Sequence, residues 1–184
     1  MEPDNFMRWI TFFILLYLFA ALQASHLGAV PNRDPANWPC IEYLPLLAVF
    51  YALYAAETSA PLCALICGVV YDLQTFEFVG ISTVPLALVC LGVVKIRLSL
   101  FREHFISQAL VSFLAVLAFG LLSAMTHLAT GSFASGSSFV SHFGSYAGNA
   151  VYSSFVAPGI FWILFHLQGI LGFSSHGPRT RLHP

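Results

Sequence analysis

Long apolar runs separated by short polar breaks dominate this chain. The expected boundaries of the six runs are residues 7–30, 39–56, 60–78, 81–94, 105–128 and 146–171. A helix needs roughly 20 apolar residues to cross about 30 Å of hydrocarbon, and these runs lack the alternating pattern of a membrane β-barrel. Because backbone groups in hydrocarbon must bond within the protein, the pattern predicts transmembrane α-helices. The expected fold is all-α, with one six-helix transmembrane domain over residues 1–173 and a polar tail over residues 174–184.

The polar breaks indicate how the runs are connected. Residues 31–38 are rich in Pro, Asn and Asp, which is typical of a loop outside the membrane. Thr58 or Ser59 can cap the helix that follows, whose first turn tolerates Pro61. Residues 130–145 are rich in Gly and Ser and predict a flexible loop. Pro158 lies inside the last run and predicts a kink there.

Composition supports a membrane environment and excludes one class of partner. Hydrophobic residues make up 58% of the chain and charged residues 8%, whereas soluble domains carry roughly 25% charged residues. The net charge of −1 comes without a basic block, so we expect no nucleic-acid binding, which needs clustered Lys and Arg.

The positive charges predict the orientation of the six spans. Lys and Arg are retained in cytoplasmic loops during insertion. If both termini are cytoplasmic, six of the seven Lys and Arg residues fall on the cytoplasmic side and only Arg33 falls outside. An odd number of spans would weaken this asymmetry. We therefore expect a multi-pass inner-membrane protein with cytoplasmic N- and C-termini.

Asp72 is an acid well inside the third run. An ionisable group near the bilayer centre costs roughly 2.5–3.5 kcal/mol on insertion scales, so it needs a role that offsets this cost. One interpretation is a proton or ligand site. The other, which we favour, is a structural acid bonded to neighbouring hydroxyl or backbone groups. Glu77, one turn further on, is more simply a solvated residue at the helix end.

Small residues are spaced for close helix packing. Gly68 precedes Asp72 by four positions, which places both on one helical face. Ala20, Ala24 and Gly28 repeat every fourth residue in the first run, a pattern that suits contact with another helix. That contact could be internal or with a partner protein, and the sequence leaves both open.

The remaining polar and sulfur-containing residues favour packing roles. Gln23, Gln108 and Asn149 lie within runs, where we expect hydrogen bonds between helices. Cys63 and Cys67 are one helical turn apart in an apolar run, without His or carboxylate at ligand spacing, so we expect no metal site. The sequence contains no HExxH, GxSxG, P-loop or Rossmann glycine motif, and we expect neither enzymatic activity nor a cofactor.

Two segments carry patterns that are typical of one family of membrane proteins. In LPLLAVFYALYAAETSAPLCALICGVVYDLQTFEFVGISTVPLAL, the features shared with the family are an apolar span, a short turn, then a helix ending in G-x-x-x-D-L before a glycine. The matching residues are Gly68, Asp72, Leu73 and Gly80. The segment GNAVYSSFVAPGIFWIL resembles the closing helix of the family through Asn149 and Pro158. Through these residues the chain resembles, over about residues 41–171, the MreD family of bacterial rod shape-determining membrane proteins.

The resemblance implies a non-enzymatic scaffold of the rod complex, or elongasome. Such a protein binds MreC directly and acts with MreB, RodA and a class B penicillin-binding protein through the complex, supporting peptidoglycan synthesis and cell shape. The resemblance also implies a fold like the substrate-binding (S) components of energy-coupling-factor (ECF) transporters. That likeness supplies the alternative function, a vitamin-binding transporter subunit, which would enclose its ligand in a pocket lined by aromatic and hydrogen-bonding groups.

Overall fold

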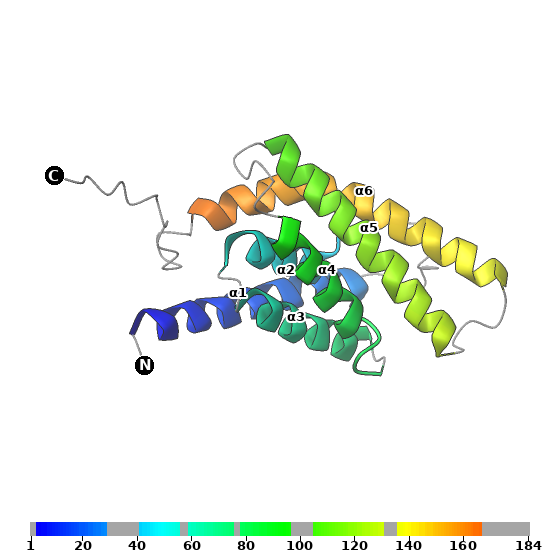
Figure 1. The fold of residues 1–184 in the computed structure, drawn as a ribbon, viewed down its shortest axis with the longest axis horizontal. Helices are drawn as coiled ribbons and strands as arrows, with labels where there is room; N and C mark the ends of the chain where they lie inside the picture. Colours follow the sequence, from blue (N-terminus) through cyan, green and yellow to red (C-terminus); the bar gives the residue numbers. More distant parts are fainter. Residues whose placement is uncertain are drawn as a thin grey trace.

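The computed structural model describes residues 3–28, 41–55, 59–75, 78–96, 105–130 and 136–166. Within these ranges the secondary structure is six α-helices, which confirms the all-α prediction for the described part of the chain. They are α1 (Pro3–Gly28), α2 (Tyr43–Tyr54), α3 (Ser59–Thr75), α4 (Thr83–Ile96), α5 (Phe105–Ala129) and α6 (Gly136–His166). The beginning of α1 and the end of α6 lie at the same end of the molecule (Figure 1).

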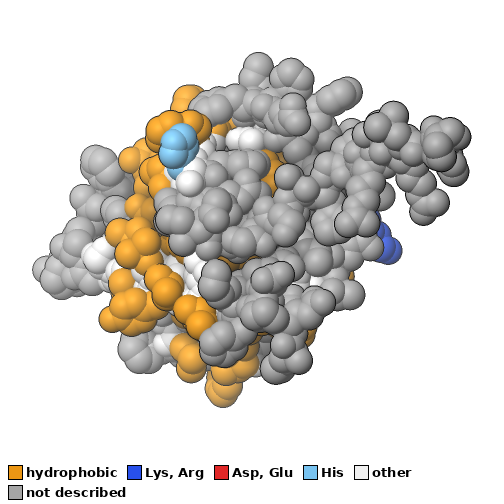
Figure 2. Space-filling view, turned by 90° about the vertical axis from the view of Figure 1, so that its left-hand side faces the viewer, with side chains coloured by type: hydrophobic (Ala, Val, Ile, Leu, Met, Phe, Trp, Pro, Cys, Tyr) orange, Lys and Arg blue, Asp and Glu red, His pale blue; other side chains and the backbone are white. Residues whose placement is uncertain are grey.

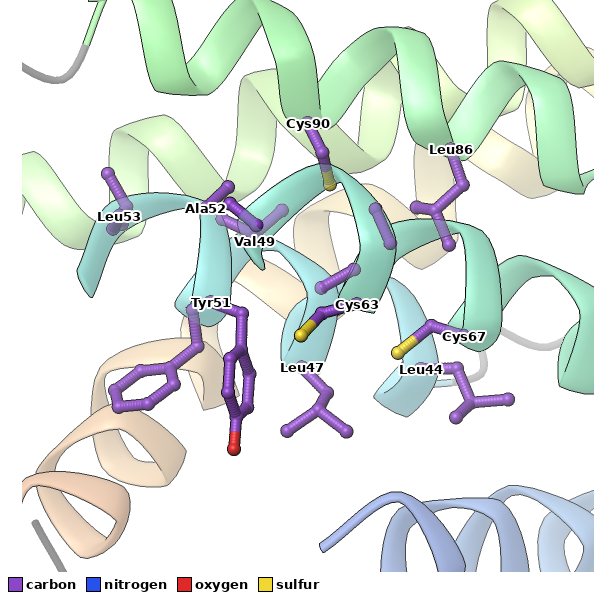
Figure 3. Close-up of a cluster of buried hydrophobic side chains, with 14 of the residues drawn as sticks. Leu44, Leu47, Val49, Tyr51, Ala52, Leu53, Cys63, Cys67, Leu86 and Cys90 are labelled. Carbon is purple, nitrogen blue, oxygen red and sulfur yellow. The ribbon is translucent and has the colours of Figure 1, made fainter. Parts of the chain in front are cut away.

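The short helix α2 forms the centre of the fold. Every residue from Leu44 to Leu53 is buried, because α2 packs against each of the other five helices. At a rise of about 1.5 Å per residue its 12 residues extend only about 18 Å. The core around α2 takes side chains from α3 and α4, with Cys63, Cys67, Leu86 and Cys90 around it (Figure 3).

Proline marks the start of the three central helices. Pro45, Pro61 and Pro85 are each the third residue of their helix, in α2, α3 and α4 respectively. A proline lacks the backbone N–H, but the first turn of a helix has no intrahelical acceptor for that group. These positions therefore start helices without losing a hydrogen bond.

The helix α1 is apolar on both of its faces. Phe12 and Leu15 are buried in the core, whereas Ile14 and Tyr17 are 62% and 79% exposed. A soluble amphipathic helix would carry charged and polar residues on its outer face. Exposed aliphatic and aromatic side chains on the outer face of a helix suit contact with lipid, not with water.

Length and composition identify two described segments that could cross a membrane alone, Ser107–Ala129 and Tyr146–Leu164. The other apolar helical segments are shorter: Trp9–Ser25, Tyr43–Tyr54, Ser59–Thr75 and Thr83–Ile96. The count of six spans and the span boundaries therefore remain predictions.

The expectation of a flexible loop over residues 130–145 is wrong for most of its length. Helix α6 begins at Gly136, ten residues before the predicted span. Each Ser or Gly in a helix costs at most about 1 kcal/mol relative to Ala, and a helix that is already nucleated extends at low cost. The α5–α6 hairpin is accordingly longer than the hydropathy pattern indicated.

Candidate functional site

The Asp72 carboxylate joins helix α3 to the start of helix α4. Asp72 is one turn from the end of α3 and fully buried. Its Oδ2 accepts hydrogen bonds from the Gly80 N–H (2.7 Å), the Thr83 N–H (3.2 Å) and the Thr83 hydroxyl (2.7 Å). Its Oδ1 accepts a bond from the Ser82 N–H (2.8 Å). These N–H groups precede or begin α4 and have no intrahelical acceptor, so a carboxylate from a neighbouring helix caps α4 and faces its positive end.

The two glycines of the motif make this arrangement possible. Gly80 has a φ of +119°, a conformation that side chains disfavour, and presents its N–H to Asp72. A Cβ atom on Gly68 would lie 2.6 Å from the Thr83 Cα, so α3 and α4 touch backbone to backbone there. Gly68 and Asp72 share one face of α3 and both meet Thr83. Leu73, the next motif residue, points outward and is 62% exposed.

A second buried carboxylate lies just before helix α2. Glu42 is 5% exposed, and its oxygens accept hydrogen bonds from the Asn149 amide (3.0 Å) and the Gln23 amide (3.5 Å). The Tyr71 side chain is a further hydrogen-bond partner. The Glu42 N–H donates to the Ser153 hydroxyl (3.0 Å). These five residues, here named the Glu42 cluster, bring together α1, α3, α6 and the start of α2.

Glu42 is not among the residues singled out from the sequence, although the signal was present. It lies inside the run predicted over residues 39–56, so the insertion-cost argument applied to Asp72 applies equally to it. The prediction that Gln23 and Asn149 form hydrogen bonds between helices is confirmed. Their shared acceptor could not be read from spacing, because the three residues are far apart in the sequence.

Both clusters lie within a region that matches a known family. A family model for the rod shape-determining protein MreD matches residues 6–168. The chain belongs to the MreD family. This membership places the protein among membrane proteins with a role in rod-shape determination. No curated protein and no solved structure gives a significant match to the chain.

Asn149 and Pro158, the residues matched to the closing MreD helix, have different surroundings. Asn149 bonds to Glu42. Pro158 is buried in α6, and the helix continues through it to His166. A proline in this position removes one backbone hydrogen bond, and the expected kink stays a prediction.

The three small residues that repeat along α1, Ala20, Ala24 and Gly28, do not share the same surroundings. Ala20 is half-buried against the core, and its carbonyl oxygen accepts a hydrogen bond from the Gln74 amide (2.8 Å). Ala24 is exposed. Gly28 ends α1, and what surrounds it lies outside the described residues. Ala20 therefore packs internally, while Ala24 is open to a partner or lipid.

The other polar and sulfur groups are part of the packed interior. The Gln108 amide of α5 donates to the Tyr54 hydroxyl of α2 at 3.1 Å, as expected for a hydrogen bond between helices. Cys63, Cys67 and Cys90 are buried, and no disulfide joins these three cysteines. Cys40 and Glu77 lie outside the described residues. Within the residues that can be searched, no three His, Cys, Asp or Glu side chains are placed to hold a metal ion.

Proposed function

We propose that this MreD-family chain is a non-enzymatic scaffold of the rod complex that binds MreC in the bacterial inner membrane. The observation that carries the proposal is the family match over residues 6–168. The geometry is compatible with it, because both described buried carboxylates are engaged in bonds between segments of the chain itself. MreB, RodA and a class B penicillin-binding protein would join through the complex, in support of peptidoglycan synthesis during elongation.

The proposed topology is six spans with both termini cytoplasmic. Its support is the distribution of Lys and Arg along the sequence together with the apolar outer surface. Figure 2 shows hydrophobic side chains gathered over the described part of one face. Exposed hydrophobic residues also occur on α6, where Phe155 is 83% and Trp162 is 63% exposed. A surface of this kind suits contact with lipid and with the apolar helices of partners.

We place the MreC contact on the outer face of α1. Among the described residues, α1 packs only against α2 and α3, so its opposite face has no neighbour within the described part of the chain. Tyr17, Ala21 and Ala24 are exposed on this face at helical spacing. The two alanines permit close approach of another helix, and the tyrosine ring adds contact area.

Photocrosslinking in membranes tests both the partner and its position. A photoreactive amino acid at position 17 should give an adduct with co-expressed MreC. The same residue at position 88 is the control, because Leu88 is similarly accessible on α4, 53% exposed, and is not on α1. Adducts at position 88 but not at 17 would move the contact to another face.

Affinity purification distinguishes the proposed scaffold function from the alternative function as a vitamin-binding transporter subunit. A tagged chain expressed with MreC should retain MreC through purification from mild detergent. Failure to retain it, together with a co-purified vitamin in the native mass spectrum, would replace the scaffold proposal with the ECF-like one. In a rod-shaped host, depletion of the protein should produce rounded cells, and unchanged rods would contradict a role in elongation.

A further inference from the structure

The Glu42 cluster joins two helices that do not otherwise meet in the described structure. Helix α1 packs against α2 and α3, whereas α6 packs against α5 and α2, and no packing of α1 on α6 is found among the described residues. Gln23 of α1 and Asn149 of α6 nevertheless donate to opposite oxygens of one carboxylate. Glu42 therefore bridges the first helix and the last.

The orientation of the Gln23 amide is fixed from its other end. The Leu44 N–H, in the first turn of α2, donates to the Gln23 Oε1 at 3.0 Å. The Gln23 NH₂ group must then face Glu42, and turning the amide over would leave the Leu44 N–H without its acceptor. Because a buried donor without an acceptor is costly, the Gln23 amide is held in one orientation.

Helix α6 is held at two points one turn apart. Asn149 donates to the Glu42 side chain, and Ser153 accepts from the Glu42 backbone N–H. Ser153 is fully buried. Since residues four apart lie on the same face of a helix, both bonds come from one stripe of α6 and act together to set its position.

We propose that Glu42 is a positioning residue, a latch whose carboxylate holds the α5–α6 hairpin in register with α1. Gln23 and Asn149 both present amide hydrogens, and each of the two Glu42 carboxyl oxygens accepts one of them. The Tyr71 side chain is the third partner of the same carboxyl group. When the carboxylate is replaced, the N-terminal half of α6 separates from α1 and from the start of α2. This role concerns the chain alone and does not depend on MreC or on any other partner.

Exchanging the carboxylate of Glu42 and the amide of Asn149 provides the sharpest test of the latch. In Glu42→Gln, one oxygen becomes an NH₂ group that faces an amide donor. In Asn149→Asp, two carboxylates face each other at the distance of a hydrogen bond. The double variant Glu42→Gln/Asn149→Asp restores one donor opposite one acceptor, with the chemistry reversed, while the side-chain oxygen of the introduced glutamine still accepts from Gln23. If the double variant recovers the parent arrangement of α1 and α6, the arrangement depends on the specific hydrogen bond between positions 42 and 149 and not on general packing.

Spin-label distances in lipid nanodiscs report the latch directly. Labels are placed at Ala24→Cys on α1 and Val151→Cys on α6, both exposed positions, with Cys40→Ser in every sample. The buried Cys63, Cys67 and Cys90 are retained. We expect one narrow distance distribution for the parent, a loss of that narrow peak in each single variant, and its return in the double variant.

Two adjacent serines of α6, Ser153 and Ser154, supply a matched pair of variants for the spin-label experiment. Ser153→Ala removes the acceptor of the Glu42 N–H and should broaden the distribution. Ser154→Ala should not, because within the described ranges the Ser154 hydroxyl bonds only to the Val151 carbonyl oxygen of its own helix (2.7 Å). Parent-like distributions in both Glu42→Gln and Asn149→Asp would overturn the proposal. If the single variants fail to insert, the double variant decides, since its failure would contradict the latch and its recovery would support it.

Discussion

Replacement of Asp72 by Asn tests the capping role of this residue with the least change in shape. Four of the hydrogen bonds to Asp72 divide unequally, with three on Oδ2 and one, from the Ser82 N–H, on Oδ1. The Ser82 side chain is a further hydrogen-bond partner of the carboxylate. Asn keeps a single acceptor oxygen, which should take the Oδ2 position. Its NH₂ group then faces the Ser82 N–H, so a buried donor loses its acceptor and meets another donor.

The expected loss of stability follows from two contributions. A buried N–H left without an acceptor costs about 1–3 kcal/mol. Removal of a negative charge from a helix N-terminus costs about 0.3–1 kcal/mol, and up to about 2 kcal/mol when the site is partly buried. We therefore expect Asp72→Asn to lower the free energy of unfolding by about 1–5 kcal/mol.

Two measurements check this prediction. Unfolding in mixed micelles of a mild detergent and SDS compares the free energy of unfolding of parent and variant. Amide hydrogen exchange shows where the loss occurs, and the N–H groups of Gly80, Ser82 and Thr83 should exchange faster in Asp72→Asn. In cells, the variant should also impair complementation of a strain that lacks the protein.

Thr75→Val is the matched control. Thr75 is on the same helix, three residues from Asp72. Among the residues that the structure describes, its hydroxyl bonds only to the Tyr71 and Asp72 carbonyl oxygens of α3 (3.1 and 3.3 Å). Its loss should cost less than about 1 kcal/mol. If Asp72→Asn were no less stable than Thr75→Val, with residues 80–83 still protected from exchange, the capping role would be refuted. Glu77→Gln supplies a second comparison, and equal behaviour of both acids in the complementation assay would remove any special role for Asp72.

Glycine substitutions test the close approach of α3 and α4. Gly68→Ala should destabilise by about 1–3 kcal/mol, because the new methyl group meets the Thr83 backbone and must push the helices apart. Gly92→Ala is its control in a helix with free space around it, where it should be neutral or stabilise by up to about 1 kcal/mol. Gly80→Ala should cost about 1–3 kcal/mol through its φ of +119° alone, and a variant as stable as the parent in the same micelle assay would contradict that strain.

Part of the candidate site could be predicted from sequence and part could not. Asp72 stands out because an acid in an apolar run carries an insertion cost, and the preferred structural interpretation agrees with the bonds that it forms. Its partners could not be deduced, since the turn over residues 78–82 must fold back on α3 before those N–H groups converge. Glu42 carries the same sequence signal, an acid inside a predicted run, but its hydrogen bonds to Gln23 and Asn149 could not be deduced, because only the packed structure brings the three residues together.

The sequence by itself determined that the protein is an α-helical membrane protein. Its long apolar runs predict helices, because backbone N–H and C=O groups in hydrocarbon must form hydrogen bonds within the protein. The G-x-x-x-D-L pattern and the Asn and Pro of the last helix also indicated the family. Tertiary structure decided where each polar group would be satisfied, because buried donors and acceptors pair by distance in space and not by spacing along the chain. It thereby made Asp72 a cap for a neighbouring helix and placed Glu42 between the first helix and the last.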